Sequence, residues 1–401
     1  MVSGGGLYGS IVLTLVDLLL YNESFELILM RPKSKATNHI SQRMYLVPIL
    51  SNALDILELL QQTKTTFSLE EIHAKTGVAK STAFRLLKTF VHRGYITKSE
   101  NGKYRLVNRP SKLRFGYASM CERMPFPAAV TDSIRNAANA SGIELLVLDN
   151  NFDAGTAISN VEEFISEKVD LVIEFQADQQ SAAYIAHRLA EAAIPMIAVD
   201  IPHPRAIFFG VDNYRVGYEA GKLLASHAQQ HWGGRADIFL GLGIDQAGSL
   251  VGSRLSATLR AVTKELDNTS DMEIIMQDSH GLAEHSRKIT SEVLKKHPKA
   301  KHILIATTSD SSAFGVVQAV RDLKRLKHVA IASQDCVAEA VAEMQRYNSP
   351  LIGSISHEAH TYGPRLIQLG LSILKNEAID PYYFVEHRVV RKEDLCSTTT
   401  A

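Results

Sequence analysis

The sequence has little cysteine and no hydrophobic run long enough for a membrane span. Three cysteines, odd in number and far apart among 401 residues, do not make a disulfide framework and favour a reducing compartment. The apolar stretch from Leu7 to Met30 contains Asp17 and lacks both a basic start and a cleavage site, which argues against a signal peptide. Its uninterrupted part is also too short to cross a bilayer. We expect a cytoplasmic protein with no membrane contact.

Net charge is absent too, because the formal value is +0, but the charges are unevenly placed. Between Lys64 and Arg114 there are twelve Lys or Arg residues and three acidic ones, a local charge of about +9. The rest of the chain therefore carries about −9. A strongly basic region at one end indicates a polyanionic partner.

Three consecutive helices are predicted early in the chain. Apolar residues at helical spacing mark the first, from Leu50 to Leu60. Ser68 stands three residues before Glu71, the spacing of a capping box that opens the second. A glycine turn follows, and the third helix begins near Ala79. Its expected core-facing stripe is Ala83, Leu86, Leu87, Phe90 and Val91.

Two short strands are predicted after Gly94. The runs YITKS and KYRLV flank Asn101–Gly102, a strong hairpin signal. This order of elements is a winged helix-turn-helix, whose third helix fits the major groove of DNA and whose wing can neutralise phosphates. The residues predicted to contact double-stranded DNA are Lys80, Ser81, Thr82, Arg85, Lys88, Lys98, Lys103 and Arg105.

Residues 45–108 resemble the DNA-binding domain of the isocitrate-lyase-regulator (IclR) type of bacterial transcription factor. The residues that carry the resemblance are ALDILELL, FSLEEIHAKTGVAKSTAFRLLKTFVHRGYI and GKYRL, most specifically TGVAKSTAFRLL and RGYI. The resemblance implies that Lys80, Ser81, Thr82 and Arg85 lie in the groove. Because two-fold DNA sites mirror two-fold proteins, we expect a homodimer on a DNA operator.

The remainder alternates short apolar strands with amphipathic helices. Such alternation indicates parallel sheets covered on both faces. Nine strand-like units exceed one compact sheet, so we predict a two-lobed α/β domain behind the small α+β winged helix. The strand segments are LRFGYAS, IELLVLD, VDLVIEF, IPMIAVD, RADIFLGLG, MEIIMQD, KHILIAT, HVAIASQ and LIGSIS.

These patterns divide the chain into four parts. We expect an extension over 1–43, the winged helix over 45–108, a linker over 109–113 and the two-lobed domain over 114–395. The extension matches no motif; it is either an accessory hairpin or, as we favour, an artefact of a start codon upstream of Met44. The segment VNRPSK has no helical pattern, so no hinge helix is expected and coupling must run through the dimer arrangement of the wings.

Polar residues stand where several predicted strands end. Ligands of open α/β folds bind at the carboxyl ends of strands, although an Asp after a strand is commonly a turn or cap residue. The recurrence favours a binding site. The residues are Asp149, Asp200, Asp212, Asn213, Asp310, Asp335 and His357.

Residues 112–395 are similar to the type I periplasmic sugar-binding domain of ribose-binding protein and of lactose-repressor-type sensors. The similar segments are MPFP, IPMIAVD, FFGVDNYRVGYEAGKLL, GSLVGSRLSATLRAV, TTSDSSAFGVVQAV, IASQDC and GSISHEAHTYG. The resemblance implies two lobes joined by three crossovers. One would hold 112–211 with 358–382, and the other 212–357 with 383–395.

The resemblance also implies a small-molecule effector, a sugar or sugar-like metabolite, and a set of residues that bind it. Phe126 would stack on the ligand, Asp200 and Asn213 would bind hydroxyls, and Asp335 would accept a pair of them. Arg254, placed at a strand-to-helix turn, would fork onto adjacent oxygens. Ser309, Asp310 and His357 complete the predicted ligand-binding set.

Three positions depart from the pattern of this family. Pro127 replaces a frequent second aromatic, Ile201 follows Asp200 where Arg is frequent, and Ser309 replaces a frequent Asn. These departures make a simple pentose or hexose doubtful and favour a derivatised sugar or another polyol-like metabolite.

Enzyme motifs are incomplete. GLGIDQ lacks the third glycine of a dinucleotide fingerprint, and GVAKST lacks phosphate-loop spacing. His227 and His231 are an i,i+4 pair without a third metal ligand and are expected on a solvated helix face, while His357 and His360 are one residue short of metalloprotease spacing. We expect no catalytic residue, metal or cofactor. The hypothesis is a ligand-responsive transcription regulator; the alternative is a cytoplasmic sugar-binding protein whose winged helix serves oligomerisation.

Overall fold

The computed structural model describes residues 47–63, 65–99, 101–107, 113–267 and 269–396. The chain forms two compact units that divide between residues 111 and 112. The predicted extension 1–43 and most of the predicted linker 109–113 lie outside the described residues. No helix in the described part of the chain is long and apolar enough to cross a membrane.

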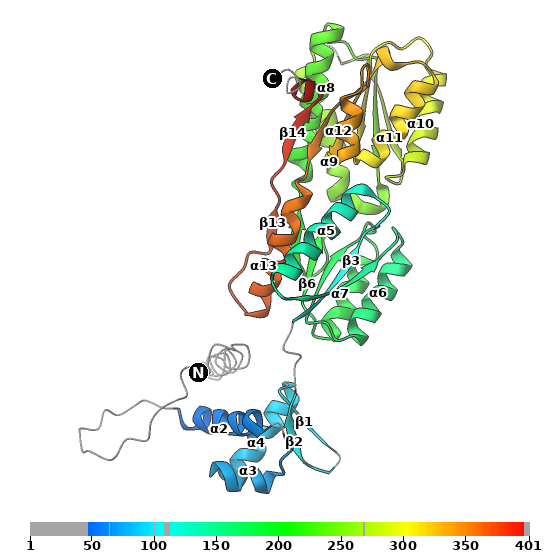
Figure 1. The fold of residues 1–401 in the computed structure, drawn as a ribbon. Coiled ribbons are helices and arrows are strands. Elements are labelled where there is room, and N and C mark those ends of the chain that lie inside the picture. The colour runs from blue at the N-terminus through cyan, green and yellow to red at the C-terminus, as the bar shows by residue number, and fades with distance from the viewer. Residues whose placement is uncertain (1–46, 64, 100, 108–112, 268, 397–401) are drawn as a thin grey trace, which may run out of the picture. The chain divides into compact units, whose positions relative to one another are not determined.

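The first unit is a winged helix-turn-helix, as predicted (Figure 1). Its helices are α2 (Pro48–Thr63), α3 (Leu69–Thr76) and α4 (Lys80–His92), and an antiparallel hairpin joins β1 (Ile96–Lys98) to β2 (Tyr104–Leu106). The expected capping box opens α3, since Ser68 Oγ accepts from Glu71 N and Glu71 Oε2 accepts from Ser68 N. Gly77 ends α3 at a φ of 73°, a left-handed cap that favours glycine.

The core of this unit follows a narrower stripe of α4 than expected. Ala83, Leu87 and Phe90 are buried and lie four and three residues apart, on one face of the helix. The prediction was wrong for Val91, which is 39% exposed, because one further residue turns it about 100° away from that face. Leu86 is partly buried against the core.

The second unit is the predicted two-lobed α/β fold, with a six-stranded sheet in each lobe. All nine predicted strands are present; β7, β13 and β14, of three or four residues each, were too short to be predicted. The first sheet, in the order β13-β7-β6-β5-β3-β4, contains β3 (Arg114–Ser119), β4 (Glu144–Asp149), β5 (Leu171–Phe175), β6 (Met196–Val199), β7 (Ile207–Gly210) and β13 (Tyr382–Phe384). The second, in the order β14-β12-β11-β10-β8-β9, contains β8 (Ile238–Gly243), β9 (Glu273–Asp278), β10 (Ile303–Thr307), β11 (Val329–Asp335), β12 (Leu351–Ser356) and the antiparallel β14 (Arg388–Arg391).

Helices cover both faces of each sheet (Figure 1). In the first lobe, α5 (Pro125–Ala140) and α13 (Tyr362–Leu374) pack together opposite α6 (Ala154–Ser166) and α7 (Ala182–Glu191). In the second lobe, α8 (Asn213–Trp232) and α9 (Gly248–Glu265) lie opposite α10 (Ala283–Lys296), α11 (Asp310–Asp322) and α12 (Ala338–Met344). The short α14 (Lys392–Cys396) ends the described chain.

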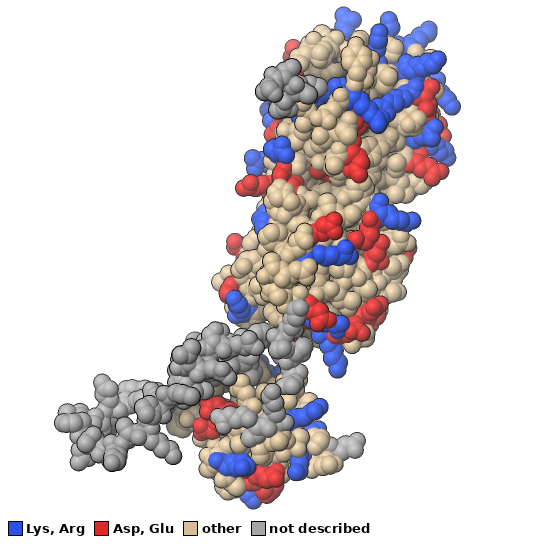
Figure 2. Space-filling model, in the orientation of Figure 1, with Lys and Arg blue, Asp and Glu red and all other residues tan. Residues whose placement is uncertain are grey.

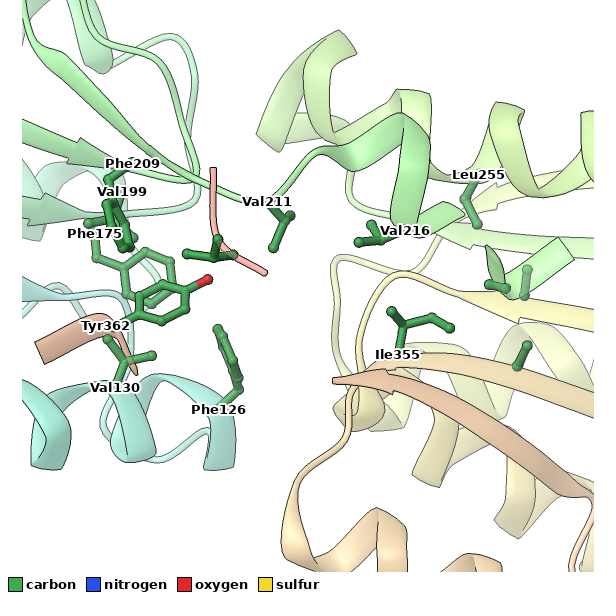
Figure 3. Close-up of a cluster of buried hydrophobic side chains, with 14 of the residues drawn as sticks. Phe126, Val130, Phe175, Val199, Phe209, Val211, Val216, Leu255, Ile355 and Tyr362 are labelled. Atoms are coloured by element: carbon green, nitrogen blue, oxygen red, sulfur yellow. The ribbon is translucent and has the colours of Figure 1, made fainter. Parts of the chain in front are cut away.

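Three crossovers join the lobes, at residues 211–212, 357–358 and 385–387. The third lies slightly later than expected: β13 pairs with β7, so the chain leaves the first lobe after Phe384 instead of after residue 382. One apolar cluster continues through both lobes, with Val211 of the first crossover between them (Figure 3). The crossovers therefore bring strand ends from both sheets to the boundary between the lobes, which we call the interlobe cleft.

Candidate functional site

The first unit presents an open helix start beside exposed basic side chains. No side chain caps α4 at Ala79, and its first turn holds no acidic residue, whereas α3 is fully capped. Free N–H groups at a helix start bind anions. Figure 2 shows Lys and Arg side chains on the visible surface of this unit, with acidic ones among them. Lys80, Ser81, Arg85, Lys88, Lys98 and Arg105 are exposed, and Thr82 and Lys103 are partly buried.

Neighbouring side chains hold several of these cations without burying them. Lys80 Nζ lies 3.9 Å from Glu70 Oε1, an exposed pair that DNA could displace. Lys88 Nζ lies 5.5 Å above the ring of Phe84, and Lys98 Nζ lies 5.5 Å above that of Tyr104. The structure thus brings the predicted helix and wing residues onto the surface of one small unit.

Arg254 lies at the centre of the interlobe cleft. Its Nε donates to Asn213 Oδ1 at 3.0 Å and one Nη donates to the carbonyl of Thr308 at 2.7 Å. The prediction of its local position was wrong: Arg254 lies in the second turn of α9 and not at its start. It comes close to α8 because of Gly217, where a Cβ would lie 2.0 Å from the Arg254 carbonyl oxygen.

Asp200 faces Arg254 from the first lobe. Its backbone is left-handed, with a φ of 60°, and its carboxylate lies against Gly210, where a Cβ would lie 2.5 Å from Oδ1. Burial raises the pKa of Asp200 to about 6, opposed by the charge of Arg254. Oδ1 is buried and makes no hydrogen bond within the described residues. A buried acceptor without a partner is costly unless a ligand or water satisfies it.

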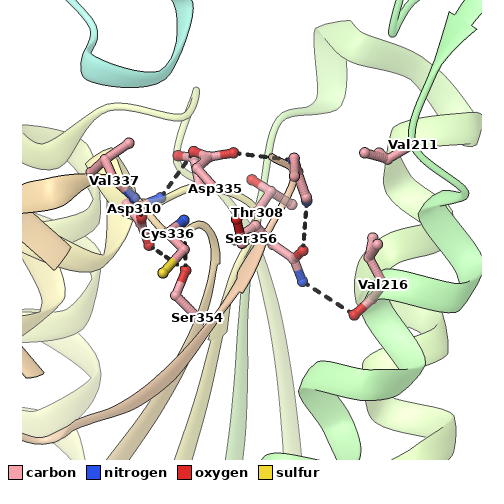
Figure 4. A network of polar contacts seen from close by, with 12 residues as sticks. Val211, Val216, Thr308, Asp310, Asp335, Cys336, Val337, Ser354 and Ser356 are labelled. Atoms are coloured by element: carbon pink, nitrogen blue, oxygen red, sulfur yellow. Dashed lines mark hydrogen bonds and ion pairs between the residues drawn. The ribbon is translucent and has the colours of Figure 1, made fainter. Parts of the chain in front are cut away.

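Asp335 and His357 meet on the side of the second lobe. Oδ1 of Asp335 lies 3.4 Å from Nδ1 of His357, whose Nε2 lies 3.0 Å from Gln334 Oε1 (Figure 4). Burial raises the pKa of Asp335 to about 8, and the carboxylate of Asp310 adds to the shift. Burial also holds the pKa of His357 well below its usual range, and Arg254 lowers it further.

Aromatic rings form the first-lobe wall of the cleft. Phe126 packs edge-on against His357 and Tyr362, with centroids 5.6 and 5.8 Å apart, and Phe209 contacts Tyr362 at 5.2 Å. Figure 3 shows the hydroxyl of Tyr362 directed away from Phe175 and Val199. That hydroxyl is buried and has no partner among the described residues, and burial together with the charges of Asp200 and Asp335 raises its pKa.

Sequence reasoning missed Tyr362 and Gln334. Tyr362 lies in a segment that carries the family resemblance, but nothing in the sequence pattern indicates that its hydroxyl faces the cleft. Gln334 precedes Asp335 in a strand, where neighbouring side chains normally point to opposite faces. Both residues are detectable only through contacts that are distant in sequence.

Several predicted residues already have partners within the protein. The carboxylate of Asp310 accepts from the hydroxyls of Ser333 and Ser354 and from Val337 N. Ser309 caps α11. Asp149 accepts from two turn amides and Asp212 caps α8, as the simpler interpretation of strand-end residues predicts. Ile201 packs in an apolar contact with Ala182 of its own lobe and Ala247 and Val251 of the other.

The prediction for the histidine pair of α8 was wrong for His227. Its ring packs edge-on against Trp232 at 4.9 Å and lies 4.5 Å from that of His231. Burial and the neighbouring His231 lower the pKa of His227 to about 4. His227 is therefore a partly buried ring and not a solvated one.

The two units of the chain match different families of known proteins. Residues 49–100 match the IclR helix-turn-helix domain. Over 64 residues the chain is 41% identical to the HTH-type transcriptional regulator XynR of Escherichia coli (strain K12). The matched segment is 16% of this chain and 25% of that relative. The match thus spans only about a quarter of the curated relative.

The second unit resembles solved solute-binding proteins. A periplasmic solute-binding protein from Actinobacillus succinogenes 130z with bound D-allose matches with a TM-score of 0.62 and 20% identity, over 71% of this chain and 100% of that one. One from Agrobacterium vitis with bound allitol has a TM-score of 0.64 and 16% identity, over 72% and 98%. One from Bacillus halodurans C-125 with bound myo-inositol has a TM-score of 0.62 and 18% identity, over 72% and 97%.

At these identities the likeness establishes the fold alone. The family match is more direct, because residues 119–378 fit the model of the periplasmic binding protein domain and make up more than half of the chain. They include most strands of both sheets, the first two crossovers and the residues of the cleft named above. The chain belongs to the periplasmic binding protein domain family.

Proposed function

We propose that this protein is a transcription regulator whose two-lobed unit senses a sugar or sugar-like polyol and whose winged helix binds double-stranded operator DNA. The observation that carries the proposal is the combination in one chain of a basic winged helix and a cleft with orphaned polar groups. The two matched domains are a helix-turn-helix and a periplasmic binding protein domain, which supports a non-catalytic role. Binding to chromosomal DNA requires a cytoplasmic location.

The DNA-binding surface consists of the start of α4 and the wing. Lys80, Ser81, Thr82 and Arg85 occupy the first two turns of α4, where side chains reach base edges and phosphates. Lys88 continues that surface, and the wing adds Lys98, Lys103 and Arg105. Contacts to phosphates would make the affinity fall steeply with salt.

A double variant tests this surface. Lys80→Ala with Arg85→Ala should lower affinity for a selected operator fragment about a hundredfold, at about 1–3 kcal/mol for each lost contact. It should also flatten the dependence on salt, measured by fluorescence anisotropy from low to moderate ionic strength. Lys295→Ala with Lys296→Ala on α10 removes the same charge from the other unit and is the matched control. Equal affinities in both double variants would favour an oligomerisation role for the winged helix.

The ligand-binding surface has donors and acceptors from both lobes. We place Phe126, Asp200, Asn213, Arg254, Asp335 and His357 in the ligand set and add Tyr362, because the buried Asp200 Oδ1 and Tyr362 hydroxyl have no described partner. The backbone N–H of Asp310 donates to Asp335 Oδ2, and Ser309 caps α11, so we propose supporting roles for both residues outside the ligand set. A hydroxyl both donates and accepts, so a polyol can satisfy such groups, and the ligands named for the similar structures are uncharged polyols.

A thermal-shift screen against a carbohydrate and polyol library tests the sensor role. A ligand at a hundred times its dissociation constant adds about 2.7 kcal/mol to the stability of the folded state. The second unit should therefore unfold at a higher temperature with the cognate compound, and Asp200→Asn should remove the shift. No stabilisation by any member of a broad library would contradict sugar sensing.

Two exposed sheet edges support a homodimer. β4 and β9 are edge strands of six residues, and Ile274 and Met276 on β9 are 50% and 41% exposed. Long apolar edges are usually covered in stable proteins, and we propose that a second copy covers these. Sedimentation analysis should give a dimer for the natural chain and a monomer for Ile274→Lys with Met276→Lys; a natural chain that sediments as a monomer would contradict the proposal.

A further inference from the structure

A chain of polar contacts runs from the cleft into the second lobe. Asp335 Oδ1 lies 3.4 Å from His357 Nδ1, His357 Nε2 lies 3.0 Å from Gln334 Oε1, and Gln334 Nε2 donates to the carbonyl of Val216 on α8 at 3.4 Å (Figure 4). His357 and Gln334 are each only 1% exposed. The protons of this chain therefore have no alternative partners in water.

The carbonyl of Val216 fixes the direction of the chain. It can only accept, so the nitrogen of the Gln334 amide must face it and the oxygen must face His357. The reverse orientation would place two acceptor oxygens together with no proton between them. His357 Nε2 must then carry a hydrogen that it donates to Gln334.

The tautomer of His357 determines which hydrogen bond Asp335 can make. Burial lowers the pKa of His357 well below its usual range, and Arg254, from α9, and His387, from the third crossover, lower it further, so its ring is neutral at pH 7. With the hydrogen on Nε2, Nδ1 carries a lone pair and can only accept. A carboxylate facing it would set two acceptors 3.4 Å apart, whereas a carboxylic acid would donate to it.

The backbone brings both partners to one imidazole. Gln334 and Asp335 are consecutive and would point to opposite faces in a regular strand. Asp335 has a φ of 93° and Cys336 a φ of 54°, so the chain turns sharply as β11 ends. Positive φ at two consecutive non-glycine residues costs free energy, and such strain is typical of functional sites.

We infer that Gln334 and His357 are positioning residues that hold Asp335 as a neutral carboxylic acid in the ligand-free cleft. Gln334 selects the imidazole tautomer, and that tautomer presents an acceptor to Asp335. The charged groups that act on Asp335 are Asp310, from the start of α11, Arg254, from α9, and Asp200, from the first lobe. The hydroxyl of Tyr362, from α13, also faces it, and the backbone N–H of Asp310 donates to Asp335 Oδ2 at 3.3 Å, which by itself lowers the pKa of Asp335. Asp310 and Asp200 disfavour a second negative charge and Arg254 favours one.

A neutral Asp335 also affects which ligands the cleft can bind; this consequence rests on the proposed sugar-sensing function. With Asp335 neutral, Asp200 and Arg254 are opposite charges that offset each other, and the carboxylate of Asp310 is hydrogen-bonded to Ser333, Ser354 and Val337 N. The cleft therefore suits an uncharged polyol better than an amino sugar or a sugar acid. The protonated oxygen of Asp335 donates its hydrogen bond to His357 Nδ1 and is not available to accept from a ligand hydroxyl. Asp335 then accepts fewer ligand hydroxyls than the pair implied by the family resemblance.

The test uses the ligand-free full chain, so its outcome does not depend on which sugar binds. In protein labelled with ¹⁵N-histidine, the side-chain shifts of His357, assigned with His357→Gln, should report a neutral ring with hydrogen on Nε2 at pH 7. Infrared difference spectra in a pH titration should contain a carboxylic acid carbonyl band that Asp335→Asn removes, with a midpoint near 8. An imidazolium, a hydrogen on Nδ1 or a midpoint below 5 would overturn the inference.

Gln334→Leu separates a positioning role from a merely structural one. Without the amide oxygen, His357 can move its hydrogen to Nδ1 and donate to Asp335, so the midpoint of Asp335 should fall by at least one pH unit, a tenfold change in proton affinity. Asp335→Asn, whose amide can donate to Nδ1, should fold and keep the Nε2 tautomer even if Gln334→Leu does not fold. An unchanged midpoint in Gln334→Leu, or a changed tautomer in Asp335→Asn, would overturn the inference.

Discussion

Glu71 of the winged helix and Asp335 of the interlobe cleft are carboxyl groups in different units, and their pKa values are shifted in opposite directions. Glu71 is exposed and accepts hydrogen bonds from Ser68, which lower its pKa. Asp335 is withdrawn from water, which raises its pKa to about 8. The same chemical group is therefore stabilised as an anion in one unit and as a neutral acid in the other.

The difference shows how each unit uses charge. The cations of α4 and the wing are mostly solvated, so each is worth little to folding and remains available to phosphates. The charges of the cleft are desolvated, so each one affects stability, protonation and ligand affinity together. Changes in the cleft should therefore have large and coupled effects, and changes on the winged helix small and separable ones.

The largest effect should come from Arg254→Ala. The variant loses two hydrogen bonds from a buried cation, each worth about 1.5–3 kcal/mol, and the positive charge that acts on Asp200 and Asp335. Ligand affinity should fall at least a hundredfold by calorimetry, and the free energy of unfolding of the second unit should fall by about 3 kcal/mol. DNA binding without ligand should persist.

Arg260→Ala is the matched control, because Arg260 is exposed on the same helix. It should leave ligand affinity and stability within experimental error. If Arg254→Ala resembles this control, the cleft is no more sensitive to charge than the surface and the contrast between the units fails.

A smaller effect should appear in the dependence of stability on pH. In the folded state the pKa values of Asp200, Asp335 and Glu174 are raised by burial to about 6, 8 and 8. These three carboxyls bind protons in the folded protein that the unfolded chain has released, so they make the free energy of unfolding fall as pH rises between about pH 4 and 8. The lowered pKa values of His203, His227 and His357 have the opposite sign below the unfolded histidine pKa, so the fall is unopposed by these histidines only above about pH 6.5. Glu71, with its lowered pKa, has the opposite sign: its contribution is present above its unfolded pKa and is lost as pH falls.

Denaturant unfolding between about pH 6.5 and 8.5 at constant ionic strength checks this sign in the window that the carboxyls dominate. Stability of the second unit should decline by an amount on the order of 1–3 kcal/mol, and Asp335→Asn should flatten the decline. Glu174→Gln removes another raised carboxyl outside the proposed ligand set and should flatten it separately. A stability that rises with pH in the natural chain, or an equal slope in all three proteins, would contradict the account.

The smallest effects should come from a matched pair of helix caps. Ser68 caps α3 in the winged helix and Ser309 caps α11 in the second unit, each through its hydroxyl. Serine to alanine at either position should cost about 1 kcal/mol. Each loss should appear only in the unfolding transition of its own unit, followed by calorimetry.

Ser309→Ala carries a second comparison. Because the hydroxyl of Ser309 is used as a cap and bonds Ser312, its loss should leave ligand affinity nearly unchanged. A tenfold loss of affinity would return Ser309 to the ligand set that the family resemblance implies.

The sequence was sufficient for most of the fold. Local signals such as the spacing of Ser68 and Glu71 and the Asn101–Gly102 pair act between near neighbours, and they predicted the winged helix element by element. The nine apolar strands were also identifiable, because buried parallel strands are continuous in hydrophobicity. The short strands β7, β13 and β14 have too few residues for a pattern and depend on pairing with distant partners.

The cleft was less predictable. Strand-end residues identified Asp200 and Asp335 as candidates, but the same pattern includes Asp149, which binds only turn amides. Whether a carboxyl is a ligand group or a brace depends on donors far along the chain, as Ser333 and Ser354 show for Asp310. Tyr362 and Gln334 could not be found without the packing that orients them.

The central claim is that occupation of the cleft changes the affinity of the winged helix for DNA. The direct measurement is the dissociation constant of the full chain for a selected operator fragment, by fluorescence anisotropy at fixed salt, with and without a saturating sugar identified by calorimetry. Saturation with sugar should change the operator dissociation constant by about 5- to 150-fold, and DNA should change the sugar affinity by an equal factor. Asp200→Asn should show no change at the same sugar concentration. An operator affinity that stays constant while calorimetry shows the natural chain saturated with sugar would contradict the account.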